Sequence, residues 1–348
     1  MRVFSSLACA LPVLARDEPP LVQSAPAPAP ARPRVLIVQN DAATEAFKAQ
    51  PEVVHALVRH GITNFTGKGD LGAAWRAIVS PQDVVGIKVH SAPGPHTGTR
   101  PAVVAGVVEG LLAARIPTNH IIIWDRELAD LRNAGFDDLA AHYRVRLAGT
   151  LDTGWDETNF YDSALLGNLV YGDLEFEKKG ERVGRKSFVS KLLTKEITKI
   201  INVTPMLSHN SIGVCGNLYG LAHGSVDNFM RFDGDAAKLA EAVPDIYNLP
   251  TLGERVALNI VDALVCQYRG QQIGRLHNST ALNELRFSTD PVALDLLSIQ
   301  EIAEQRNRSE GPPATHTNRI DVYLNAALLQ LGSADLQKID IQTVRITH

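Results

Sequence analysis

The chain has 348 residues, of which 45% are hydrophobic and 21% charged, and its formal net charge is −4. These proportions are ordinary for a globular protein, and the length allows one large core or two smaller ones. The acidic balance argues against a nucleic-acid-binding protein, which normally carries a basic surface. We therefore expect a globular protein whose partner is a small molecule and not a nucleic acid.

The N-terminus has the pattern of an export signal. Arg2 precedes an apolar stretch over residues 3–14, and the small residue Ala15 offers a cleavage point. The stretch is too short to span a bilayer, and a lipoprotein signal ending at Cys9 is the alternative. Residues 16–33 form a Pro/Ala-rich linker with little to bury. No later segment predicts a membrane span, so we expect a periplasmic or secreted protein.

The first half of the mature sequence alternates strands with helices. Short apolar runs, typical of strands buried on both faces of a parallel sheet, cover Arg34–Gln39, Val84–Val89 and Ile121–Asp125. Helical periodicity covers Thr44–Arg59, which Gly61 is expected to end, then Leu71–Val79 and Pro101–Arg115. Pro101 suits a first helical turn, because the N–H that proline lacks would have no partner there.

The second half begins with a polar insertion, residues 151–185, which predicts an antiparallel hairpin with a turn at Lys179-Gly180. We expect a short helix over Ser190–Glu196, a strand over Lys199–Thr204 and then a long loop over Pro205–Phe232. A strand over Val256–Val265 and a helix over Pro291–Gln305, capped by Asp290, follow. The last expected elements are a helix over Arg319–Leu331 and a strand over Ile339–Ile346. This order predicts an α/β fold with a mainly parallel, Rossmann-like sheet and flanking helices. It forms one domain over residues 34–348, or two lobes over 34–150 and 186–348.

Ligands of such sheets bind beyond the carboxyl ends of the strands, and three of these ends carry polar residues. The first end has Lys88, His90, His96 and Arg100, followed by the start of the helix at Pro101. Two cations and free helical N–H groups could hold a carboxylate or phosphate. The alternative is structural: Lys88 pairs with a core carboxylate and His96 is an exposed loop residue.

The second strand end is Asp125-Arg126. A carboxylate there could orient a histidine, hold a metal or accept a substrate hydroxyl, and Arg126 could bind substrate. The alternative is a local ion pair that caps the next helix. Asp262, near the end of a later strand, could join the same site.

The third strand end leads into the longest polar segment, in which glycines alternate with side chains that can bind or catalyse. The candidates in it are His209, Asn210, Cys215, Asn217, His223, Asp227, Asn228 and Arg231. Dense glycine suggests backbone that approaches a ligand closely, and long loops are often functional. The alternative is a packing face, because Gly216, Gly220 and Gly224 recur at four-residue steps.

These residue types suit acid/base chemistry. We expect His209 to move a proton, oriented by Asp125 or Asp227, while Asn210, Asn217, Asn228 and Arg231 contact the substrate. Imidazole and thiolate also suit a divalent metal, for which His209, Cys215 and His223 are the candidate ligands, although their spacing matches no standard zinc site. Cys215 is alternatively a nucleophile or a buried inert thiol.

Four segments carry a family resemblance: VVGIKVHSAPGPHTGTRP, IIIWDR, KIINVTPMLSHNSIGVCGNLYG and STDPVALD. Together they resemble the family named domain of unknown function 362, in the expected order and from about Arg34 to Val344. The resemblance implies the α/β fold, and many relatives carry export signals. Some relatives hold iron–sulfur clusters on ferredoxin-like cysteines, which this chain lacks, so no such cluster is expected.

The chain departs from that family in two places. Relatives often carry a lysine before the histidine and another before the asparagine, where this chain has Ser208 before His209 and Gly216 before Asn217. A fainter similarity links the Thr99-Arg100-Pro101 turn to the nickel-pincer lactate racemase family, at the level of fold alone.

The function that we expect is an exported enzyme acting on a small polar or anionic substrate, of isomerase, hydrolase or lyase type. Lys88 and Arg100 would anchor the substrate and His209 would transfer the proton, with or without a divalent metal. The alternatives are a periplasmic ligand- or cofactor-binding protein without turnover, and a thiol redox protein using Cys215 and Cys266. The enzyme hypothesis requires Lys88, Asp125 and His209 to meet at one edge of the sheet.

Overall fold

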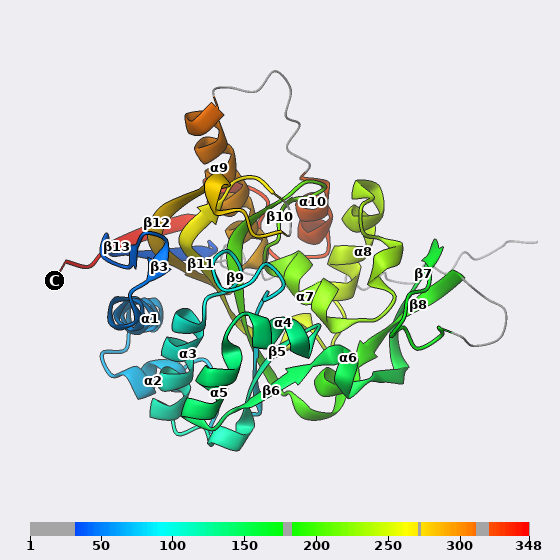
Figure 1. Cartoon of the computed structure of the whole chain (residues 1–348), viewed down its shortest axis with the longest axis horizontal. Coiled ribbons are helices and arrows are strands. Elements are labelled where there is room, and N and C mark those ends of the chain that lie inside the picture. Colours follow the sequence, from blue (N-terminus) through cyan, green and yellow to red (C-terminus); the bar gives the residue numbers. More distant parts are fainter. Residues whose placement is uncertain (1–31, 177–182, 271–272, 311–319, 348) are drawn as a thin grey trace, which may run out of the picture. The chain divides into compact units, whose positions relative to one another are not determined.

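The computed structural model describes residues 32–176, 183–270, 273–310 and 320–347 (Figure 1). The expected signal peptide, residues 1–31 as a whole and the expected turn at Lys179-Gly180 lie outside the described residues. The described residues form one compact unit. Within the described ranges, no helix is both long and apolar enough to cross a membrane.

A nine-stranded sheet forms the centre of this unit. Its order is β13-β1-β12-β11-β9-β4-β5-β6, with the short β10 paired to β9. The strands are β1 (Arg34–Gln39), β4 (Val85–Lys88), β5 (Ile121–Asp125), β6 (Arg146–Gly149), β9 (Lys199–His209), β10 (Gly213–Val214), β11 (Val256–Gln267), β12 (Ser279–Ser288) and β13 (Asp340–Arg345). Along the path every pair is parallel except the two that β12 makes with its neighbours. The predicted α/β fold with a mainly parallel sheet is confirmed.

Helices cover both faces of the sheet and bury two hydrophobic cores. One face carries α1 (Pro51–Thr66), α2 (Leu71–Arg76), α3 (Pro101–Ala113) and α5 (Phe136–Tyr143), and the other carries α7 (Asn217–Ser225), α8 (Ala236–Tyr247), α9 (Pro291–Glu310) and α10 (Asp321–Leu328). Along β5, Ile121 and Ile123 enter the first core and Ile122 and Trp124 the second. This alternation explains why the strand is apolar throughout.

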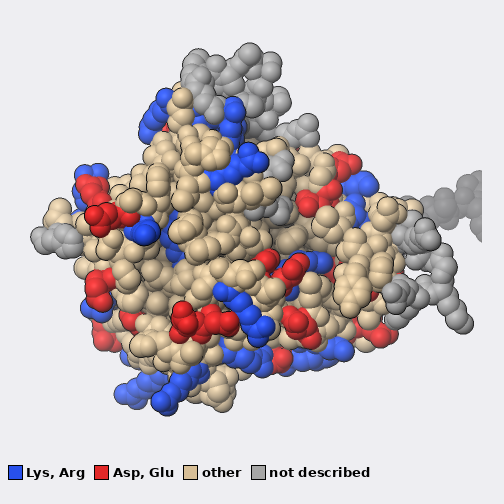
Figure 2. Space-filling model, in the orientation of Figure 1, with Lys and Arg blue, Asp and Glu red and all other residues tan. Residues whose placement is uncertain are grey.

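The polar insertion is an antiparallel ribbon of β7 (Trp155–Asn168) and β8 (Val183–Ser190), which extends to the right in Figure 1. It pairs with no strand of the main sheet among the described residues. On the face of the molecule in Figure 2, acidic and basic side chains are interspersed among neutral ones.

The helix expected over Thr44–Arg59 begins later than predicted. Residues 44–49 form a small hairpin of β2 (Thr44–Glu45) and β3 (Lys48–Ala49), so that α1 starts at Pro51. Gly61 does not end this helix: it lies inside it, and a Cβ there would come within 2.2 Å of the Phe287 ring. Gly67, in the left-handed conformation with φ 68°, ends the helix instead.

The loop predicted over Pro205–Phe232 was wrong. β9 continues to His209, β10 turns back against it, and α7 follows. The glycines are spaced for packing, because a Cβ at Gly216 would meet the Asp295 carboxylate at 2.2 Å and one at Gly224 would meet the Lys88 Cε at 2.3 Å. The packing-face alternative therefore describes this segment, and it brings α7 directly onto the strand ends.

Candidate functional site

A buried ion pair joins the ends of two adjacent strands. Lys88, the last residue of β4, donates from Nζ to Asp125 Oδ1 at 2.8 Å and to the carbonyl oxygen of Val89. Both side chains are at most 5% exposed. Because β4 and β5 are parallel neighbours, their carboxyl ends meet, and α7 closes over Lys88 at Gly224. The structural alternative for Lys88, pairing with a core carboxylate, is the arrangement observed.

Asp125 is held on all sides by donors. Its Oδ2 accepts from the Ser91 N–H at 2.7 Å and from the Ser91 hydroxyl at 2.6 Å, and its Oδ1 also accepts from the Arg126 N–H at 2.8 Å. Burial alone would raise the pKa of Asp125, but the charge of Lys88 and these hydrogen bonds hold the pKa well below its usual value. Asp125 is therefore ionised throughout the physiological range.

Three histidines, which we call the histidine cluster, lie at this edge of the sheet: His90 and His223 interact electrostatically with the ion pair, and His209 interacts with His90. Burial lowers the pKa of His90 to about 4, with Lys88 and His209 acting in the same direction and Asp125 opposing them. Burial also lowers the pKa of His209 to about 4, and the pKa of His223 falls well below its usual value. All three imidazoles are thus uncharged at neutral pH.

Aromatic contacts order the cluster. The Tyr219 ring lies between two of its members, with centroids 4.7 Å from His209 and 5.4 Å from His223, and it stacks on His223 at 13°. Phe229 closes the other side of His223 at 5.1 Å. Because Tyr219 and His223 occupy successive turns of α7, the helix presents them together to the end of β9.

Several polar atoms in the cluster and in residues adjacent to it in the chain lack hydrogen-bond partners. Among the described residues, none bonds to the buried His90 Nε2, His223 Nδ1, Ser208 Oγ or Ser225 Oγ. Buried polar atoms are usually satisfied, and an unsatisfied one costs about 1–3 kcal/mol. This unused capacity makes the cluster the candidate position for a ligand.

Arg100 does not provide a free anion anchor. Its Nη1 and its backbone N–H bind the two oxygens of Asp262 at 2.8 and 2.9 Å, and its Nη2 donates to the His96 carbonyl oxygen at 2.7 Å. The start of α3 is thereby occupied by the Asp262 carboxylate, and the His96 side chain is exposed. With Lys88 also paired, both cations expected to hold an anion are neutralised by core carboxylates.

Arg126 links β5 to the end of α7. Its Nη1 donates to the carbonyl oxygens of His223 and Val226, at 3.1 and 2.6 Å. These contacts fix the histidine at the C-terminal end of α7, where the carbonyls of a helix would otherwise lack donors. Arg126 thus positions His223 instead of capping the helix that follows β5.

Asp227, Asn228 and Arg231 hold the hairpin, and we call them the hairpin latch. Asp227 accepts from the N–H groups of Leu174 and Phe188 at 2.7 and 2.5 Å. The amide of Asn228 donates to the Lys186 carbonyl oxygen at 3.1 Å. The guanidinium of Arg231 donates to the Ser187 hydroxyl and to the carbonyl oxygens of Ser163, Leu165 and Gly184.

Neither Asp125 nor Asp227 orients His209 by a hydrogen bond, contrary to the prediction. Among the described residues, the hydrogen bonds of Asp125 go to Lys88, Ser91 and Arg126, and those of Asp227 go to the hairpin backbone. The carboxylate that acts electrostatically on His209 is Asp233, which raises its pKa against the effect of burial. The Nδ1 of His209 accepts from the Ser211 N–H at 3.1 Å.

Asn217 belongs to the scaffold, and Asn210 is exposed. The backbone and side-chain N–H groups of Asn217 both donate to Asp295 Oδ1, at 2.7 and 2.8 Å, and the Leu218 N–H donates to Oδ2 at 3.0 Å. Asp295 was not among the predicted residues, although it ends the STDPVALD segment. Its pKa is raised to about 7 by burial, and it anchors the start of α7.

The proposed metal ligands are not assembled. Across the described ranges, no three His, Cys, Asp or Glu side chains lie where they could hold a metal ion together. Cys215 is fully buried, and burial raises its pKa well above the usual value, as expected of an inert thiol. Cys266 is likewise a buried free thiol. Each cysteine packs in the hydrophobic core.

Comparison with known protein families identifies the scaffold. The model of the domain of unknown function DUF362 matches residues 85–300. The chain belongs to the DUF362 family. The matched range contains the ion pair, the histidine cluster, the hairpin latch and Asp295, so the DUF362 region comprises the whole candidate site.

The comparisons with curated proteins and with solved structures assign no activity to the chain. No curated protein matches the chain. A solved structure from Thermotoga maritima is 11% identical, with a TM-score of 0.41, over 75% of this chain and 59% of that one. The chain thus spans about 59% of the length of that protein.

Proposed function

We propose that this chain is an exported enzyme that transfers a proton to and from a small polar organic substrate at the histidine cluster. The observation that supports the proposal is the gathering of three uncharged imidazoles at the strand ends, two of them beside a buried ion pair, with His90 Nε2 and His223 Nδ1 lacking partners among the described residues. Strained or unsatisfied polar groups at strand ends are typical of functional sites.

The chemistry follows from the state of the imidazoles. An uncharged imidazole has one ring nitrogen that donates and one that accepts a hydrogen bond. A substrate hydroxyl or an acidic C–H group could give its proton to the accepting nitrogen. The Asp125 charge raises the pKa of His90 and would stabilise the imidazolium that forms. We therefore assign the transfer to His90 first and to His209 as the second group.

The charge balance favours a substrate recognised by hydrogen bonds. Lys88 and Arg100 each face a buried carboxylate at 2.8 Å, so neither offers an uncompensated positive charge. A neutral hydroxyl, carbonyl or amide substrate would use the free ring nitrogens without displacing either pair. Isomerisation, hydrolysis and elimination all include such a proton transfer.

A turnover screen tests the proposal. Purified mature protein is incubated with mixtures of small polar metabolites, and their conversion is followed by NMR, with elemental analysis of the same sample to detect a bound metal. We expect His90→Gln to lower the rate at least about 100-fold while ligand binding persists, and Lys68→Gln, at an exposed and distant position, to leave it unchanged. Binding without conversion by the wild type would contradict the enzyme and support the ligand-binding alternative.

Export is tested separately by N-terminal sequencing of the mature chain. Cleavage after Ala15 is expected of the signal-peptide pattern. A mature chain that begins at Cys9 would support the lipoprotein alternative instead. A chain that retains its first residues inside the cell would contradict export.

A further inference from the structure

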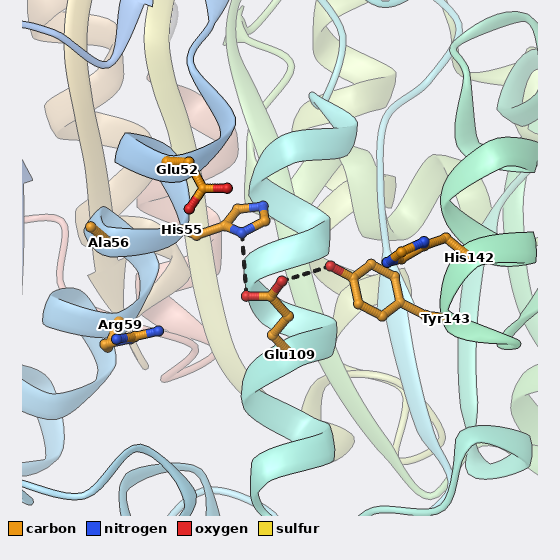
Figure 3. A pocket seen from close by; sticks show the side chains of 7 residues that line it. All are labelled: Glu52, His55, Ala56, Arg59, Glu109, His142 and Tyr143. Atoms are coloured by element: carbon orange, nitrogen blue, oxygen red, sulfur yellow. Dashed lines mark hydrogen bonds and ion pairs between the residues drawn. The ribbon is translucent and has the colours of Figure 1, made fainter.

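A cavity lies in the helical layer, and none of its lining residues belongs to the histidine cluster. It has a volume of about 540 Å³, within the range of small-molecule sites. Helices α1, α3 and α5 form its walls (Figure 3). Its lining side chains are Glu52, His55, Ala56, Arg59, Glu109, His142 and Tyr143.

Glu109 is fixed at the centre of this helix-layer cavity. Its Oε2 lies 3.3 Å from His55 Nδ1, and its Oε1 accepts from the Tyr143 hydroxyl at 2.7 Å (Figure 3). Burial and the neighbouring Glu109 raise the pKa of Tyr143, so the phenol keeps its proton and donates. Gly106 allows α1 to approach α3, because a Cβ there would lie 3.0 Å from Val58. The three helices are therefore cross-linked at the cavity floor.

Two opposite charges in the cavity remain uncompensated. Glu52 and Arg59 are both exposed and lie on either side of His55 along α1 (Figure 3). Among the described residues, neither has a hydrogen-bond or ion-pair partner for its side chain. Seven residues of helix separate their Cα atoms by about 10.5 Å. The cavity thus presents a carboxylate near one end and a guanidinium near the other.

We propose that the helix-layer cavity is a binding site for a short zwitterionic peptide of about three residues. The amine of the peptide would face Glu52 and its carboxylate would face Arg59. An extended chain spans about 3.3–3.6 Å per residue, so three residues cover roughly the 10 Å between the Cα atoms that carry the two charged side chains. A fork of guanidinium N–H groups suits a carboxylate, and Tyr143 and His142 form a wall against the peptide backbone. This site shares no residue with the proposed enzyme function and does not depend on it.

Calorimetric titration of the full mature chain with triglycine tests the proposal. We expect saturable binding of one peptide per chain, weakened at least about 5-fold by Glu52→Gln and by Arg59→Gln. Charge-matched controls at exposed positions outside the cavity, Glu157→Gln and Lys68→Gln, should bind as the wild type does. N-acetyl-triglycine amide, which has neither terminal charge, should bind more weakly than triglycine.

Three results would overturn the proposal. One is the absence of saturable triglycine binding, and another is binding that both cavity variants retain unchanged. The third is equal binding of free glycine, which is too short to reach both charges. Circular dichroism of the two variants, which alter exposed side chains, verifies that any loss of binding does not reflect unfolding.

Discussion

The segment that follows β9 has two parts whose residue types are alike and whose roles differ. The first part, from His209 through α7, packs on Lys88 of the Lys88–Asp125 pair at Gly224 and leaves His223 Nδ1 and Ser225 Oγ without hydrogen-bond partners among the described residues. The second part, the hairpin latch, makes its hydrogen bonds with the backbone of β7, of β8 and of the segment between them. The comparison teaches that polar side chains near glycine mark a ligand site only where their hydrogen-bonding capacity is left unused.

Among the variants considered, Lys88→Met should lower the free energy of unfolding most. Removing the ammonium leaves the Asp125 carboxylate buried without its cation, which costs about 3–5 kcal/mol of the free energy of unfolding. Urea unfolding measures the loss, with Lys68→Gln as a control that should stay within about 0.5 kcal/mol of wild type. A loss below about 1 kcal/mol would mean that the pair is hydrated and the site open.

Arg231→Met should weaken the second part by about 3 kcal/mol, because it leaves several carbonyl oxygens of the hairpin without a donor. The carbonyls of Ser163 and Leu165 lie in the irregular stretch of β7 between Asp162 and Gly167, where the ladder to β8 is interrupted. Limited proteolysis should then cut the hairpin faster. Unchanged proteolysis would show that the latch is not what holds it.

The next largest effect is the pH dependence of the stability that Asp227 of the latch contributes. Burial, assisted by Asp173, raises the pKa of Asp227 to about 7, against an ordinary value near 4. The folded chain therefore binds this proton more tightly, and the stability it contributes is lost as pH rises from about 4 to 7. Relative to Asp227→Asn, the wild type should lose about 2 kcal/mol between pH 5 and pH 7.

Urea unfolding of both proteins at several pH values measures that difference. Arg126 and the backbone N–H groups of Leu174 and Phe188 oppose the shift, and Arg231 is the other nearby cation. A stability difference that does not vary with pH would show that Asp227 is ionised in the folded state.

The smallest effect is a change in one histidine pKa. NMR titration of the wild type should place the midpoints of His90 and His209 near pH 4. In Arg231→Met both pKa values should stay unchanged, because the latch does not contact these two histidines. In Lys88→Met the pKa of His90 should rise, since the Lys88 charge lowers it, while that of His209 stays. Equal pKa shifts in Arg231→Met and Lys88→Met would show that the two parts do not differ in their effect on the histidines.

Elements with strong local signals could be predicted. The buried strands β4 and β5, the proline start of α3 and the Asp290 cap of α9 follow from runs of apolar residues and from unsatisfied helix ends. The end of α1 and the helix α7 could not, because Gly61 has the pattern of a helix end and the glycines around Gly216 have that of a ligand-binding loop. Their role depends on Phe287 and Asp295, which are distant in the chain.

The sequence by itself determined the class of fold and the strand ends at which polar side chains gather, because periodicity and caps depend on neighbours within about one turn. The tertiary structure alone decided which of these side chains are already engaged. Lys88 and Asp125 are 37 residues apart, and Arg100 and Asp262 are 162 apart. Such partners are set by the order of strands in the sheet, and that order decides whether a charge is free to meet a ligand or buried against another charge.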